Sequence, residues 1–131
     1  MTNEEFLDNF YNIFNRAMNF SEKARSEGLL ALEEDIESDK VDNRDIFEYG
    51  MRFTLDGTDK GIIDKILSNL IEQHSDPFEL CYKKVQIEAV LSIQAGDNPR
   101  VMLASMASHI GNPELLEIEK LLSGDIELLP G

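Results

Sequence analysis

The sequence has few of the residues from which metal sites and covalent links are built. Cys81 is the only cysteine among 131 residues, so the chain has no internal disulfide and no thiolate cluster for zinc. A single cysteine beside apolar residues is typical of a buried, unreactive thiol. His74 and His109 are the only histidines, lie near expected helix ends, and lack the HxxxH or HxxE spacing of a metal site. We therefore expect neither a metal nor another cofactor.

Motifs for phosphate binding and catalysis are also missing. The glycines that punctuate the chain are isolated rather than clustered, at positions 57, 61, 96 and 111, so none forms a phosphate-cradling loop. Glu33 and Glu37 have a helical spacing that suits a shared proton or cation. In an acidic helix this spacing arises readily by chance, because the repulsion of such pairs is mild. The sequence therefore predicts a chain without enzymatic activity.

Long apolar segments are absent as well. Uncharged stretches such as Ala89–Gly96 fall well short of the roughly 20 apolar residues that span a bilayer. The first residues, Met1–Glu5, are polar and acidic and lack the basic stretch and apolar core of a secretory signal. We expect a cytoplasmic protein with no membrane-spanning segment.

Basic residues are few relative to acidic ones. The chain has 12 basic and 26 acidic side chains, which gives a formal charge of -14. A phosphate backbone or an anionic lipid surface would be repelled, so we expect no nucleic-acid partner. Acidic residues are densest between Glu33 and Asp39. This segment is either a docking site for a basic protein surface or an ordinary solvated helix face.

Helical periodicity dominates what the sequence does contain. Hydrophobic residues make up 42% of the chain, a normal share for one domain covering residues 1–131. A first helix from about Asn3 towards Glu27 is predicted by apolar residues at steps of three and four: Phe6, Phe10, Ile13, Phe14, Ala17 and Phe20. Gly28 follows, where the chain either bends or allows a neighbouring helix to approach closely.

Turn and capping signals divide the rest of the chain. Ser38–Asn43 has the composition of a surface turn, and a helix should follow from Arg44. Thr58 or Asp59 should cap the next helix, for which we expect a core-facing stripe of Ile62, Ile63, Ile66, Leu67, Leu70 and Ile71.

Proline marks the first turn of three later helices. The first is expected to start at Ser75, Asp76 and Pro77, the second at Asp97, Asn98 and Pro99, and the last at Pro113. No segment reads as a strand. The sequence thus predicts an all-α, compact bundle of six or seven helices.

Three motifs, in order, resemble the flagellar stator family of MotA, within the MotA/TolQ/ExbB proton-channel group. The segment Ala24–Glu33 (ARSEGLLALE) resembles the cytoplasmic loop of MotA. Asp56–Asp59 (DGTD), with the Ile-rich helix after it, resembles the next part of that loop, and Ser92–Arg100 (SIQAGDNPR) resembles the helix break after the last membrane segment. The resemblance covers roughly residues 16–73 and 83–107.

The membrane helices of the family have no counterpart in this sequence. In MotA two of them separate the second motif from the third, whereas here Gln73–Tyr82 is a short polar link. The first two membrane helices are missing too, so the chain looks like the cytoplasmic part of MotA without the pore. Proton conduction, which in the family needs those helices and a MotB partner, is therefore not implied.

The resemblance does imply a protein-docking role. An arginine and a glutamate of the first MotA motif face the rotor protein FliG, and they match Arg25 and Glu33 here. If one helix ran through Gly28, eight residues would separate them by about 12 Å along its axis. We expect a FliG-like rotor protein or a MotA/MotB stator component as partner, with the chain peripheral at the flagellar motor.

Two alternatives remain open at the level of sequence. Arg25 and Glu33 are also compatible with an ordinary helix surface on which Glu22 or Glu27 pairs with Arg25. The whole chain is compatible with a structural scaffold that keeps a MotA-like core without motor docking. The exposure of Arg25 and Glu33 distinguishes a docking module from a scaffold. A docking module presents both charges to solvent, whereas a scaffold buries or neutralises them.

Overall fold

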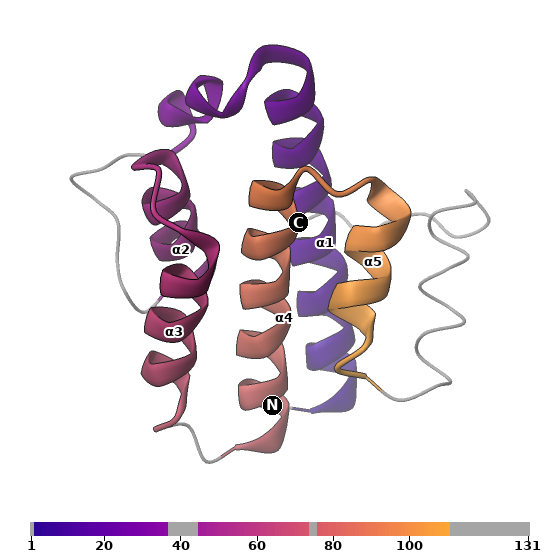
Figure 1. The fold of residues 1–131 in the computed structure, drawn as a ribbon. Coiled ribbons are helices and arrows are strands. Elements are labelled where there is room, and N and C mark those ends of the chain that lie inside the picture. The colour runs from indigo at the N-terminus through magenta and orange to yellow at the C-terminus, as the bar shows by residue number, and fades with distance from the viewer. Residues whose placement is uncertain (1, 37–44, 74–75, 111–131) are drawn as a thin grey trace.

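The computed structural model describes residues 2–36, 45–73 and 76–110, and this part of the chain contains helices and no strand (Figure 1). The all-α bundle predicted from the sequence is confirmed. The expected turn at 38–43 and the expected helix from Pro113 lie outside the described residues. The elements are α1 (Asn3–Glu27), the 3₁₀ helix η1 (Leu29–Glu34), α2 (Ile46–Leu55), α3 (Lys60–Ile71), α4 (Pro77–Ala95) and α5 (Pro99–Ala107).

Each helix from α2 to α5 begins after a short polar side chain that accepts a hydrogen bond from the first turn. In α3 this residue is Asp59, whose Oδ2 accepts from the backbone N–H of Gly61 at 2.9 Å. Such caps satisfy amide groups that have no partner within the helix. The prediction of a cap at Thr58 or Asp59 is thus confirmed for Asp59, and the other three caps are Asp45, Asp76 and Asn98.

Helix α4 is the centre of the bundle. It packs against α1, α2, α3 and α5 (Figure 1). Its residues are buried on several faces, among them Val85, Val90 and Ile93, as expected of a helix surrounded by others. Helices α3 and α5 both contact α4, but within the described part of the chain they do not contact each other.

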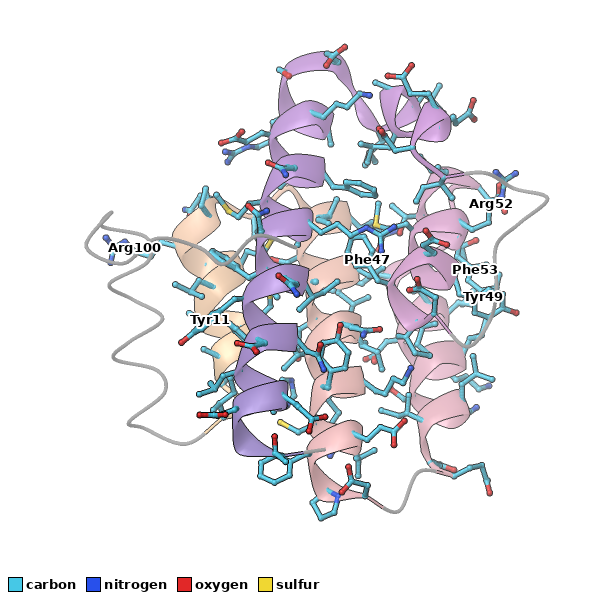
Figure 2. The ribbon with its side chains drawn as sticks, turned by 180° about the vertical axis from the view of Figure 1, so that it is seen from behind. Tyr11, Phe47, Tyr49, Arg52, Phe53 and Arg100 are labelled. Carbon is cyan, nitrogen blue, oxygen red and sulfur yellow. The ribbon has the colours of Figure 1, made fainter. Side chains whose placement is uncertain are left out.

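Helices α2 and α4 approach closely at Gly50. A Cβ atom at this position would lie 2.8 Å from one methyl carbon of Val90 and 2.9 Å from a methyl carbon of Leu67. A glycine is therefore required here by the close packing of α2 against Val90 of α4 and Leu67 of α3, rather than by a turn. Phe47, one turn earlier, is fully buried on the interior side of α2, whereas Tyr49 and Phe53 lie at its outer side (Figure 2).

The predicted core stripe of α3 is correct for only half of its residues. Ile63, Leu67 and Ile71 are buried, but Ile62 is 52% exposed and Leu70 is 37% exposed. The reason is that, among the described helices, α3 packs against α2 and α4 alone. Two neighbours cover a narrower face than the broad stripe in the sequence suggests.

Candidate protein-docking surface

The first helix ends at a glycine that turns the chain. Gly28 has a φ of +91°, in a region that residues with a side chain rarely adopt, and its N–H donates to the carbonyl of Ala24 at 2.8 Å. The chain therefore bends at Gly28, one of the two outcomes expected from the sequence. The assumption of a continuous helix through this residue is wrong, so Arg25 and Glu33 lie on different helices, α1 and η1.

Apolar side chains hold η1 against the bundle. Leu32 is fully buried, Ile36 just after η1 is 2% exposed, and Leu29 is partly buried against the same core. Helix η1 contacts both α1 and α2. Burial of side chains of this size stabilises a segment by about 1.5–3 kcal/mol each, so η1 is a fixed part of the fold.

A lysine of α1 adds a second link between α1 and η1. The ammonium group of Lys23 donates to Asp35 at 2.9 Å and also contacts the carboxylate of Glu34. These hydrogen bonds to Glu34 and Asp35 raise the pKa of Lys23 above its usual value. Two of the acidic residues that the sequence offered as a docking site are thus paired within the chain. Glu37 and Asp39 lie outside the described residues.

Arg25 and Glu33 differ from Lys23 and Asp35 in their contacts. Both are exposed, and neither side chain forms an ion pair or hydrogen bond with another described residue. The local pairing of Arg25 with Glu22 or Glu27, which was the alternative interpretation, is therefore not found. Between them in the sequence lies Leu30, which is 69% exposed and the most exposed of the large hydrophobic residues described.

Another arginine shows how the same side chain behaves in a structural role. Arg16 of α1 donates to Glu48 at 2.8 Å and lies 3.8 Å from the carboxylate of Asp45. Its guanidinium also stacks over the rings of Phe20 and Phe47, at 5.4 and 4.9 Å from the ring centroids. Arg16 joins α1 to the start of α2 from a partly buried position, whereas Arg25 has no such contacts among the described residues.

We call the exposed group Arg25, Leu30 and Glu33 the docking surface. The two charged residues were singled out from the sequence. Leu30, and Lys23 with its pairing to Glu34 and Asp35, were not. The run from Leu29 to Leu32 is apolar throughout, and the sequence does not reveal that Leu32 faces inward and Leu30 faces solvent. Exposed apolar side chains beside charges are typical of protein-interaction sites.

Cys81 in the first turns of α4 and His109 after α5 are the described candidates for thiol or metal chemistry. Cys81 is partly rather than fully buried, and its thiol donates to the carbonyl of His109 at 3.1 Å. Burial raises the pKa of the Cys81 thiol. His109 follows the end of α5, with its ring Nε2 3.1 Å from Glu88. Among the described residues no group of three metal-binding side chains comes together, and His74 is not among them.

No helix in the described part of the chain is both long and apolar enough to cross a membrane. The chain was compared with models of known protein families, with characterised proteins and with solved structures, and none of them matched.

Proposed function

We propose that this chain is a non-catalytic protein-interaction module related to the cytoplasmic domain of the flagellar stator protein MotA. It binds a FliG-like rotor protein or a MotA/MotB stator component through Arg25 and Glu33. The observation that carries the proposal is that both charges are exposed and unpaired among the described residues, at a firmly packed end of the bundle.

Unpaired surface charges are suited to recognition for two reasons. Their interaction with a partner does not first require an internal ion pair to break, as it would for Lys23 with Asp35. They also act over a distance and steer the approach of an oppositely charged surface. Opposite signs at Arg25 and Glu33 define an orientation, since a partner must present an acidic group to one and a basic group to the other.

The packing of η1 supports the same proposal. The buried side chain of Leu32 and the ion pair of Lys23 with Asp35 hold Glu33 in place relative to α1 before a partner binds. Binding then costs little ordering of the backbone, which favours affinity. Leu30 supplies apolar contact area beside the two charges, and we expect it to be covered in the complex.

The proposal is tested by capture of partners from motile cells, with the chain expressed at its native level. A variant with Arg25→Ala and Glu33→Ala serves as the matched control, because both residues are exposed and the fold should be retained. The original chain should capture a rotor or stator protein and the control should not. Capture of the same motor protein by both, or of none by either, would count against the proposal.

Salt dependence provides a second measurement on the purified pair. Exposed charges are screened beyond about 8 Å at physiological ionic strength. The affinity should therefore fall as the salt concentration rises, mainly through a slower association rate. An affinity that is unchanged or higher at high salt would indicate an apolar interface in place of the charged one.

A further inference from the structure

A groove lies at the end of the bundle opposite η1. It has a volume of about 530 Å³ and is formed by α3 with Glu72 just after it, by α4 between Leu80 and Glu88, and by His109 after α5. In Figure 1 these segments are at the lower end of the bundle, and η1 is at the upper end. The volume lies within the range of roughly 300–1,000 Å³ that is typical of ligand-binding clefts.

The packing of the helices explains why this groove is open. Helices α3 and α5 both pack on α4 but do not contact each other in the described structure, so a strip of α4 between them is not covered by either helix. The strip contains Leu80, Lys84 and Ile87, which lie on one face at helical spacing.

The groove combines an apolar floor with an acidic rim. Ile71 and Ile87 are 4% and 5% exposed and form the floor together with the partly buried Leu80. The ionisable side chains of the lining are the carboxylates of Asp64, Glu72 and Glu88, the ammonium group of Lys84, and His109. The lining is therefore negative when His109 is neutral.

Two of the three carboxylates already accept one hydrogen bond within the chain. Asp64 accepts from the hydroxyl of Ser68 at 3.0 Å, and Glu88 contacts the ring of His109 at 3.1 Å. Each bond engages one oxygen and leaves the other. The carboxylate of Glu72 forms no hydrogen bond or ion pair with a described residue. The rim therefore keeps acceptor oxygens for a cationic donor.

We propose that this groove binds an arginine side chain from a segment of a partner protein. An arginine has an apolar stem of three methylene groups and a charged head, which correspond to the floor and the rim. Its planar guanidinium presents five N–H donors and binds carboxylates in a bidentate manner, unlike the compact ammonium group of lysine. Glu72 and Glu88 are the carboxylates that would accept these bonds.

Charge excludes the other candidates for the groove. A second copy of the chain carries a formal charge of -14 and would be repelled. The sequence after Ile110 contains five acidic residues and one lysine, so it is also a poor match for an acidic rim. This inference does not depend on the docking surface, because the two sites share no residue and lie at opposite ends of the bundle.

The test uses N-acetyl-arginine methylamide as the probe for an arginine within a peptide chain. The probe is titrated into the full-length, ¹⁵N-labelled protein, and amide chemical shifts are followed. We expect saturable shifts at Ile71, Leu80 and Ile87. The citrulline analogue has the same shape without the charge and should bind about tenfold more weakly, as expected for the loss of one charge-assisted pair.

Variants distinguish binding in the groove from a general attraction of the cationic probe to an acidic protein. Glu72→Gln and Glu88→Gln should each weaken binding by about tenfold. Glu22→Gln removes the same charge from the exposed surface of α1 and should leave binding unchanged. Shifts spread over other acidic faces, equal binding of the arginine and citrulline probes, or no effect of the two groove variants would overturn the proposal.

Free L-arginine is the final comparison, because its own carboxylate adds negative charge. We expect it to bind more weakly than the capped probe. Tighter binding of the free amino acid would assign the groove to a small metabolite and overturn the assignment to a protein segment. Since no motor protein is used, either result leaves the test of Arg25 and Glu33 unaffected.

Discussion

The two ends of this bundle use charge in different ways. At the η1 end, Lys23 pairs with Glu34 and Asp35 across α1 and η1, while the neighbouring Arg25 and Glu33 have no partner among the described residues. At the opposite end, carboxylates surround an apolar floor between helices that do not meet. Some surface charges are paired within the chain, whereas Arg25, Glu33 and Glu72 form no pair with a described residue.

Two leucines of η1 show the same contrast for apolar side chains. Leu32 is fully buried and Leu30 is 69% exposed, although they are two residues apart in one short helix. One holds η1 in place and the other contributes to the docking surface.

Leu32→Ala should have the largest effect on stability. Truncating a fully buried leucine removes its transfer free energy and leaves a cavity, so the free energy of unfolding should fall by about 2–5 kcal/mol. Leu30→Ala is the matched control and should change it by no more than about 0.5 kcal/mol. Urea denaturation followed by circular dichroism measures both. Similar losses for the two variants would mean that η1 does not pack as described.

Gly50→Ala tests the close approach of α2 and α4. The added methyl group would meet Val90 and Leu67 at 2.8–2.9 Å, and overpacking of this kind costs about 1–3 kcal/mol. Gly61→Ala adds the same methyl group at an exposed position in the first turn of α3, where its nearest neighbour is the mobile end of the Asp59 side chain at 3.2 Å. Thermal unfolding should show a lower Tm for Gly50→Ala and little change in Tm for Gly61→Ala. Equal changes would contradict the difference in packing.

Cys81 makes a pH-dependent contribution to the stability of the fold, smaller than the effects of Leu32→Ala and Gly50→Ala. Burial raises the pKa of its thiol above the ordinary value of 9.0, so the folded state holds this proton more tightly than the unfolded state. The resulting stability is fully present below the unfolded pKa and is lost as pH rises through the folded pKa. Alkylation by iodoacetamide should therefore accelerate at a higher pH in the native protein than in urea. The same pH midpoint in both states would contradict a raised pKa.

Helix boundaries were predictable because local chemistry determines them. The predicted extent of the first helix, Asn3 to Glu27, is confirmed, and so are the cap at Asp59 and the helix starts at Pro77 and Pro99. Each depends on residues within one turn of the boundary, so the sequence contains the whole signal.

Features that depend on neighbouring helices were not predictable. The apolar stripe of α3 does not reveal that α2 and α4 are the two described helices that cover it, so Ile62 and Leu70 were wrongly placed in the core. The groove brings Glu72, Glu88 and His109 together from three separate segments. The pairing of Lys23 with Asp35 depends on the bend at Gly28, which the sequence left as one of two options.

The central claim is that Arg25 and Glu33 contact a partner directly, and charge reversal with rescue tests it most directly. Arg25→Glu should change the free energy of unfolding by no more than about 0.5 kcal/mol, since the residue is exposed. It should weaken binding to the rotor or stator partner strongly, because juxtaposed like charges cost several kcal/mol. Reversal of the matching acidic residue on the partner should restore the affinity. If Arg25→Glu unfolds the protein, or leaves both stability and affinity unchanged, the docking surface is not the site of recognition.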